Sequence, residues 1–387
     1  MKQIFIFILI LFSFYTVQAS VDTAWVSYLL KRIEQQQVKD DAFFIKGSFP
    51  AYTDKYHKGY SERIKDNNTS FCIVLNTLES VRSKLTAYQS VLLDSIQVRA
   101  SGVFKKFENK NGRGTYNFWR QDMEPKFPYN WWIPFFAGNL WRVPDDFDDT
   151  VWCLTALKTD SSNAARIHDT MQHYSNYPAK RIIGCPDEYK TIPAYSTWFG
   201  KDFPVFYDLC VAANTLTFVQ QYNLQWTKAD SATLQLLVKA IQSKDYMTHY
   251  KDLSPYYENR AVILYHLAKL MTVKPIDGLE KYKTQIVTDA LELFNKSDNI
   301  LEQMILCTAL QKLGYSSPEI ELPAKEKLVW MIEHNDLAFF TGDMLGYFEG
   351  NTKKTLALFF KKALFYNQYC PAYNDALLVE YFILNKE

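Results

Sequence analysis

Apolar residues recur along this chain at the spacing of helices. From one end to the other they return at intervals of three and four residues. No run of alternating apolar and polar residues is bounded by the Asn-Gly or Asp-Gly turns that mark hairpins. The pattern therefore predicts an all-α protein.

One kind of segment repeats along the chain. A loop rich in aromatic residues, Pro or Gly leads to an acidic or amide residue, and ten or more apolar and small residues follow. The copies begin at Thr69, Asp148, Tyr207, Tyr256, Asn299 and Tyr373. Segments with one polar face lie between them and begin at Ala87, Ser161, Asp230, Gly278 and Lys353. Apolar helices thus alternate with amphipathic ones.

This alternation is typical of two concentric rings of helices. A helix surrounded on all sides loses its polar face, whereas an outer helix keeps one for water. We predict an α/α toroid of about six inner and six outer helices, forming one domain over residues 69–387. Because the repeat varies between roughly 45 and 75 residues, a helical solenoid or two bundles are the alternatives. Residues 20–68 are predicted as a helix to Lys39 and then a long loop.

The start of the chain reads as a signal peptide over residues 1–19. Lys2 precedes an apolar run from Ile4 to Tyr15, and small residues follow at Ala19 and Ser20. The run is shorter than the roughly 20 residues of a membrane span. We therefore expect an exported protein, periplasmic or secreted, with no transmembrane segment beyond the signal peptide.

Composition narrows the classes of partner. Hydrophobic residues make up 48% of the chain, enough to fill a large core. Lys and Arg number 43 against 42 Asp and Glu, so no net field attracts nucleic acid, and we expect no nucleic-acid partner. A small-molecule or glycan ligand remains as the expected partner.

The six cysteines do not follow a metal-binding spacing. None forms a CxxC pair, so the sequence indicates no structural zinc, and no metal or cofactor is expected. Cys185 and Cys370 lie in loop-like sequence and are the only pair considered for a disulfide. The remaining cysteines lie in apolar helical patterns, where they are interpreted as small buried hydrophobes; these are Cys72, Cys153, Cys210 and Cys307.

The stretch PDDFDDTVWCLTAL, residues 144–157, carries the candidate chemistry. Asp146 is placed to cap a helix, and Asp148 and Asp149 would face the positive end of its dipole. One or two acids would be enough for capping. Four crowded carboxylates, which include Asp145, repel one another, and we expect one to keep its proton well above the ordinary pKa of about 3.9. Such a group is a candidate general acid.

The five residues from Asp146 to Thr150 resemble the DxDDT motif of class II terpene cyclases, in the terpenoid cyclase and protein prenyltransferase superfamily. The barrels of that family are α/α toroids. The resemblance implies that Asp148 protonates an alkene or epoxide, with Asp146 and Asp149 as supporting carboxylates. Aromatic faces attract cationic centres. The aromatic residues expected to shape the pocket are Trp119, Trp131, Trp132, Trp152 and Phe147.

Other interpretations stay open. The same acids spell DDxxD, the magnesium-diphosphate motif of class I terpene synthases, which ranks lower because no second metal motif is present. Exported α/α toroids often process glycans, and a glycosidase needs two carboxyl groups about 5 to 9.5 Å apart. The acids near starts of apolar helices are Asp148, Asp208, Glu258, Glu302 and Asp375. For all but Asp148, helix capping is the competing explanation. A third possibility is a binding protein without catalysis.

Overall fold

A computed structural model gives the fold of most of the chain. It describes residues 23–54, 62–64, 67–122, 143–175, 182–200, 205–334, 337–343, 345, 348 and 350–385. The predicted signal peptide lies outside these residues, as do Trp131 and Trp132. The described chain is mainly helical, which confirms the predicted class at that level. Within it, no helix has the length and apolarity needed to cross a membrane.

The six predicted apolar helices are all present. They are α2 (Asn68–Ser80), α5 (Phe147–Ala156), α7 (Leu209–Gln221), α11 (Arg260–Val273), α14 (Ile300–Lys312) and α17 (Pro371–Leu384). Five of them follow an Asn or Asp whose side chain accepts from a first-turn amide, which is a strong N-cap. These caps are Asn67, Asp146, Asp208, Asn259 and Asn299. The acidic or amide residue that recurs in the sequence is therefore the cap.

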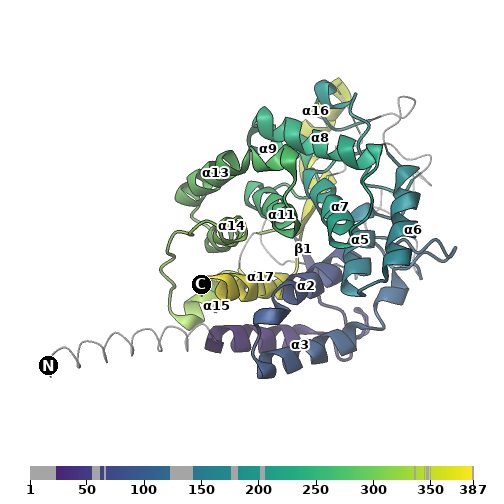
Figure 1. Cartoon of the computed structure of the whole chain (residues 1–387). Coiled ribbons are helices and arrows are strands. Elements are labelled where there is room, and N and C mark those ends of the chain that lie inside the picture. Colours follow the sequence, from purple (N-terminus) through teal and green to yellow (C-terminus); the bar gives the residue numbers. More distant parts are fainter. Residues whose placement is uncertain are drawn as a thin grey trace, which may run out of the picture.

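The six apolar helices pack in cyclic order. Each contacts the next along the chain, from α2 to α5, α7, α11, α14 and α17, and α17 returns to contact α2 (Figure 1). Their side chains are mostly buried, because neighbours cover them on several sides. The loss of a polar face in these sequences follows from that environment.

Amphipathic helices cover the apolar ones. They comprise residues 23–36, α3 (Ala87–Ala100), α6 (Ser161–Gln172), α8 (Lys228–Gln242), α13 (Lys283–Lys296) and α15 (Lys325–Glu333), with the short α9 (Asp245–Thr248), α10 (Tyr250–Leu253) and α12 (Asp277–Glu280). Helix α8 packs on α7, α13 on α14 and α15 on α17. The helix of residues 23–36 also reaches α17, where Trp25 stacks on Phe382 with ring centroids 5.7 Å apart.

A small sheet departs from the all-α prediction. The strands β1 (Ala51–Asp54), β2 (Glu62–Ile64), β3 (Phe340–Asp343) and β4 (Phe365–Tyr369) form an antiparallel sheet in the order β2-β1-β4-β3. The segment predicted as a long loop after Lys39 thus holds β1 and β2. The helix α16 (Gly350–Leu364), predicted as a further amphipathic helix, packs against β4. Strands of three to five residues are too short to show an alternating pattern.

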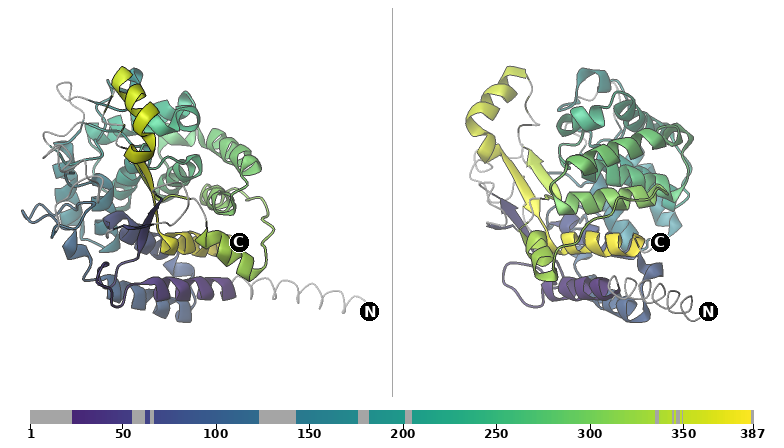
Figure 2. Two further views of the ribbon diagram at one scale, coloured as in Figure 1. Left: turned by 180° about the vertical axis from the view of Figure 1, so that it is seen from behind. Right: turned by 90° about the vertical axis from the view of Figure 1, so that its left-hand side faces the viewer.

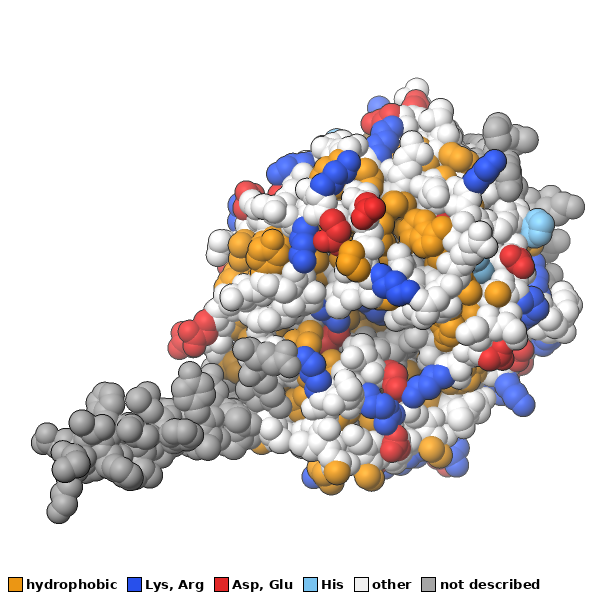
Figure 3. All heavy atoms as spheres, viewed as in Figure 1, with side chains coloured by type: hydrophobic (Ala, Val, Ile, Leu, Met, Phe, Trp, Pro, Cys, Tyr) orange, Lys and Arg blue, Asp and Glu red, His pale blue; other side chains and the backbone are white. Residues whose placement is uncertain are grey.

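The sheet lies across the end of the bundle where the apolar helices begin (Figure 2). Helix α17 starts directly after β4. The amide of Thr341 in β3 donates to the carbonyl of Tyr256, just before α11, at 2.8 Å. The rings of Tyr256 and Phe340 stack with centroids 5.7 Å apart. The opposite end carries charged side chains of both signs and is hollowed near its centre (Figure 3).

Candidate acid site

The acidic stretch begins helix α5, and Asp146 is its cap. One carboxylate oxygen of Asp146 accepts from the amides of Asp148 and Asp149, at 2.6 and 3.0 Å. The hydroxyl of Thr150 donates to the carbonyl of Asp146 at 2.6 Å and accepts from the amide of Tyr116 at 3.0 Å. The expected capping role of Asp146 is confirmed. Its side chain is committed to the backbone of its own helix.

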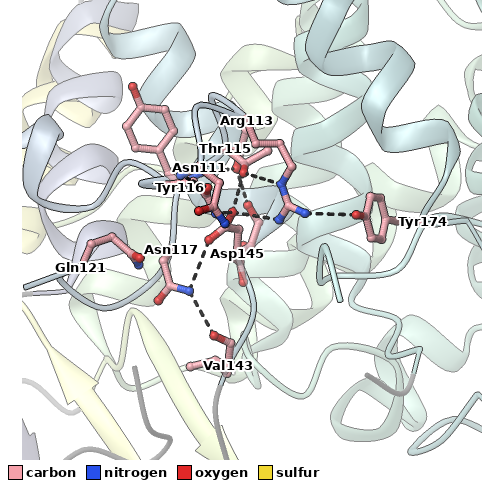
Figure 4. Close-up of polar contacts among 12 residues, drawn as sticks. Asn111, Arg113, Thr115, Tyr116, Asn117, Gln121, Val143, Asp145 and Tyr174 are labelled. Atoms are coloured by element: carbon pink, nitrogen blue, oxygen red, sulfur yellow. Dashed lines mark hydrogen bonds and ion pairs between the residues drawn. The ribbon is translucent and has the colours of Figure 1, made fainter. Parts of the chain in front are cut away.

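Asp145 belongs to a separate polar cluster outside the acid site (Figure 4). Its carboxylate accepts from Arg113 at 2.9 Å and from Asn109 at 2.6 Å, and the hydroxyl of Thr115 also donates to it. Arg113 in turn donates to the hydroxyl of Tyr174 at 3.1 Å. Asn117 donates to the other oxygen of Asp145 at 3.5 Å, so an ion pair and three neutral donors satisfy Asp145 within the loops before α5.

Asp148 lies in the interior formed by the apolar helices. Its side chain is 3% exposed. Asn214 of α7 donates to one carboxylate oxygen at 2.7 Å, and the hydroxyl of Tyr257, just before α11, donates to the other. Burial raises the pKa of Asp148, although its polar neighbours Tyr257, Asn214 and Trp152 oppose the rise. The group therefore tends to keep its proton.

The pKa values of Asp146 and Asp149 are also raised well above the ordinary range. Burial is the main cause for both, and the neighbouring carboxylates add to it. One oxygen of Asp149 accepts from the hydroxyl of Thr69 in α2 at 2.7 Å. The other oxygen of Asp149 is buried without a hydrogen-bond partner among the described residues. These directions match the expectation that the cluster holds a proton.

A histidine extends the network from Asp148. The Nδ1 atom of His266 in α11 lies 2.8 Å from the side-chain oxygen of Asn214. With the amide oriented this way, Nδ1 carries the hydrogen, because Asn214 accepts it. Burial, aided by Lys269, lowers the pKa of His266 well below its usual range. Its Nε2 atom is buried and has no hydrogen-bond partner within the described part of the chain.

Lys269 lies one turn further along α11. Its Nζ atom is 3.8 Å from the ring centroid of Trp152, which belongs to α5 on the other side of α7. Burial, with the nearby charge of Lys312, lowers the pKa of Lys269 to about 7. A lysine with this pKa is partly neutral near pH 7 and can act as a base. The indole nitrogen of Trp152 also has no hydrogen-bond partner among the described residues.

Glu380 of α17 closes the interior on the side of α14. It accepts from Lys312 at 2.7 Å, from the hydroxyl of Tyr265 at 2.7 Å and from Ser80 at 3.0 Å. Although burial alone would raise the pKa of Glu380, the charge and hydrogen bond of Lys312 lower it overall. This carboxylate is therefore paired with a cation, whereas Asp148 is hydrogen-bonded to the neutral donors Asn214 and Tyr257.

The aromatic residues of the predicted pocket divide between two places. Trp152 lies beside Lys269 and His266, and its ring meets that of His266 edge-on with centroids 6.2 Å apart. Phe147 packs on Phe199 in the loops before α7, with centroids 4.1 Å apart. Trp119 is buried in a loop segment that bridges to Asn67. Only Trp152 of the three is placed with the network around Asp148.

The other candidate acids have local partners. Asp208 caps α7 and accepts from the hydroxyl of Ser254 at 2.8 Å. Glu258 pairs with Lys251 at 3.1 Å, and Glu302 accepts from Asn259 at 2.6 Å. Asp375 is fully buried against Arg32 and Gln36 of the helix of residues 23–36. The capping explanation is confirmed for Asp208, while Asp375 serves an ion pair.

The DDxxD interpretation finds no metal cluster to support it. Asp145 and Asp149 have different partners, in the loop cluster and on α2 respectively. Across the residues that the structure describes, no three His, Cys, Asp or Glu side chains are grouped closely enough to hold a metal ion.

Pockets near the sheet are separate from Asp148. One of about 400 Å³ is lined by residues of the helix of residues 23–36, of β1 and of α15, including Arg32, Tyr52 and Glu333. Another of about 200 Å³ includes Glu258, Asn259 and Thr341. Asp148 lines neither of these two pockets.

Four members of the buried network were not predicted as site residues. Tyr257 and Asn214 lie in apolar repeat segments whose sequence resembles the other copies. His266 lies inside an apolar helix, where its Nδ1 atom is hydrogen-bonded but its Nε2 atom has no partner among the described residues. The one available signal was an ionisable residue inside an otherwise apolar helix, which applies to both His266 and Lys269.

Comparison with known proteins gives no further guide. No family model matches the chain, and neither does any curated protein or solved structure.

Proposed function

We propose that this chain is an exported α/α-toroid enzyme in which Asp148 acts as a general acid, in the manner implied by the resemblance to class II terpene cyclases. The toroid is supported by the cyclic packing of α2, α5, α7, α11, α14 and α17. Export is supported by the apolar N-terminal run and its small residues. The substrate class that the resemblance implies is a polyprenyl alkene or its epoxide.

The environment of Asp148 carries the proposal. Burial keeps the proton on the carboxyl group, since the charged form is poorly solvated there. When the proton leaves, Tyr257 and Asn214 already donate to both oxygens and stabilise the carboxylate that forms. Donors fixed before the reaction stabilise developing charge at little reorganisation cost. Asp148 thus has a raised pKa together with donors already in place for its charged form.

Two neighbours fit the rest of an acid–base cycle. The Nζ atom of Lys269 lies 3.8 Å from the ring centroid of Trp152, and an aromatic ring of this kind would also stabilise a carbocation. Lys269, with its pKa lowered to about 7, is a base that can take a proton from the product cation. The acid lies on α5 and the base on α11, on opposite sides of α7.

The test is a titration of the Asp148 carboxyl carbon by NMR, combined with turnover of polyprenyl alkenes and epoxides. Asp148→Asn assigns the signal and removes the acid. Asp289→Asn is the matched control, because Asp289 is also buried and bonded to a tyrosine, Tyr246, but lies on α13. We expect the pKa of Asp148 to lie above that of an ordinary Asp, and turnover to be lost only in Asp148→Asn.

Two outcomes would contradict the proposal. A pKa of Asp148 below about 4 would mean that the hydrogen bonds dominate over burial, and that the acidic stretch only begins a helix. Equal turnover in the native chain and Asp148→Asn would remove Asp148 from the chemistry. A third outcome is that the native chain shows no turnover, while Asp148→Asn keeps its affinity for the ligand. That result would point to a binding protein.

A further inference from the structure

Two cysteines meet between α2 and α5, beside the acid site. The Sγ atoms of Cys72 and Cys153 lie 3.1 Å apart, although 81 residues separate them in the chain. Both side chains are completely buried. A disulfide has an S–S distance of about 2.05 Å, so the two sulfurs are roughly 1 Å from bonding distance.

Polar contacts on both sides hold this pair in register. On one side, Thr69 of α2 donates to Asp149 of α5 at 2.7 Å. On the other, the side-chain amide of Asn76 donates to the carbonyls of Cys72 and Trp152, at 2.9 and 2.7 Å. The facing positions of the two sulfurs are therefore set by the helix–helix contact, and a small rotation of each side chain would bring the atoms together.

Cys185 and Cys370, the pair considered for a disulfide from the sequence, are arranged differently from Cys72 and Cys153. Cys370, at the start of α17, directs its sulfur to the carbonyl of Ser70 at 3.8 Å. Cys185 lines a pocket with Asp187 and Lys190. Cys185 and Cys370 are both thiols, so the disulfide considered for them is not present.

We propose that Cys72 and Cys153 form a disulfide that joins α2 to α5 when the chain folds in an oxidising compartment. Exported proteins meet such conditions. The proposal does not depend on acid chemistry at Asp148. The proposed disulfide would bond α2 covalently to α5, the helix that carries the acidic cluster.

The bond forms by exchange with a disulfide-bearing oxidant. The thiolate of one cysteine attacks a sulfur of the oxidant, giving a mixed disulfide. This first attack breaks the S–S bond of the oxidant and releases its other sulfur as a thiolate. The thiolate of the second cysteine then attacks the protein sulfur of the mixed disulfide, the bond to the oxidant breaks, and both oxidant sulfurs end as thiols. Two electrons and two protons pass from the protein to the oxidant. Because both sulfurs are buried in the folded chain, the exchange takes place before α2 and α5 close on each other.

The bond would persist once the helices are packed. Burial raises the pKa of the Cys72 thiol well above its usual range, so its sulfur is a poor leaving group when a reductant attacks the bond. The surrounding helices also exclude reductants from the sulfur atoms. The cross-link closes a loop of about 80 residues in the unfolded chain, which restricts that state and raises the thermal midpoint.

The test refolds the full chain with oxidised glutathione and then maps its cysteines. After unfolding in a thiol-reactive maleimide, four of the six cysteines should be labelled, and digestion should release a peptide pair joining Cys72 to Cys153 that dithiothreitol separates. Cys72→Ala and Cys153→Ala should each label all five remaining cysteines. Cys307→Ala is the matched control and should keep the linked pair, with three labelled.

A second measurement separates the bond from a folding defect. The Tm of the native chain should be several degrees higher oxidised than reduced, and this difference should vanish in Cys72→Ala. Labelling of all six cysteines in the oxidised native chain would overturn the proposal, as would a linked pair that joins Cys185 to Cys370. Since peptide mapping uses the native chain, the result does not require the variants to fold. It is also independent of the titration of Asp148.

Discussion

The hydroxyl of Tyr257, just before α11, donates to the carboxyl group of Asp148 in α5, which lies 109 residues earlier in the chain. This bond lowers the pKa of Asp148 against the effect of burial. Removing this hydrogen bond should therefore change the pKa of Asp148 without moving Asp148 from the start of α5.

Tyr257→Phe should raise the pKa of Asp148 further, since the carboxylate loses one donor. The free energy of unfolding should fall by about 1–3 kcal/mol, because a buried acceptor is left with fewer partners. Carbon NMR of the carboxyl group and urea unfolding measure the two effects. Tyr246→Phe, which removes a similar bond to Asp289, should lower stability but leave Asp148 unchanged. An unaltered titration in Tyr257→Phe would show that this hydrogen bond does not tune the acid.

Lys269 should make stability depend on pH above neutrality. The pKa of Lys269 is about 7 in the folded chain and 10.5 in the unfolded chain. At pH values between these two, the unfolded chain binds a proton that the folded chain does not. Stability then rises with pH through that window, by up to about 1.4 kcal/mol per pH unit. Below pH 7, Lys269 is protonated in both states, and its burial lowers the free energy of unfolding by a constant amount.

The measurement is the free energy of unfolding from pH 6 to pH 10 in the native chain and in Lys269→Met. The difference between them should shrink as pH rises, since methionine removes the cost of burying a charge. Lys281→Met is the matched control, because Lys281 also lies over an aromatic ring, Tyr282, at 5.0 Å but is exposed. Parallel pH curves for the native chain and Lys269→Met would contradict the lowered pKa.

Arg113→Gln should affect stability but not the acid. Asp145 is 4% exposed, and Arg113 is its charged partner at 2.9 Å. We expect a loss of about 1–3 kcal/mol in the free energy of unfolding, because a buried carboxylate loses a charged donor. Arg120→Gln breaks a more exposed pair with Asp122 and should cost at most about 1 kcal/mol. A shift in the titration of Asp148 in Arg113→Gln would mean that the two clusters are coupled.

Gly47→Ala should destabilise the contact between the N-terminal region and α3. Gly47 has a φ of +93°, and a Cβ atom there would lie 2.1 Å from the carbonyl oxygen of Arg99. Backbone atoms cannot move aside easily, so we expect a loss of 2 kcal/mol or more, roughly, by thermal unfolding. Gly112→Ala is the control, since Gly112 has a φ of +70° but open space around it. It should cost only about 1 kcal/mol, from backbone strain.

The sequence predicted the helices well because their environment leaves a local pattern. Asn67, Asp208 and Asn299 mark the starts of apolar helices, and the loss of a polar face identifies which helices are surrounded. The sheet left no such pattern, because the partner of Tyr52 is Tyr369, at the other end of the chain. Pairing over that distance depends on tertiary contacts.

The site was predictable only in part, for a similar reason. The crowding of acids next to a helix start is local, and so Asp146 and Asp148 could be singled out. Asp145 instead pairs with Arg113, outside the acid site. This pairing depends on how the preceding loops fold. The meeting of Asn214 with His266 joins two helices and leaves no trace in either sequence segment.

The pairing of β1 with β4 also sets the order in which the molecule can be built. The hydroxyl of Thr53 donates to the carbonyl of Asn367, 314 residues later. One edge of β1 pairs with the nearby β2, but the other edge gains its partner β4 only when the last apolar helix is about to be made. Contacts between such distant residues slow folding, since a long loop must close first. During synthesis the early helices are therefore made well before the strand that joins β1 to β3. Final closure of the fold is therefore a late event that only a nearly complete polypeptide can reach.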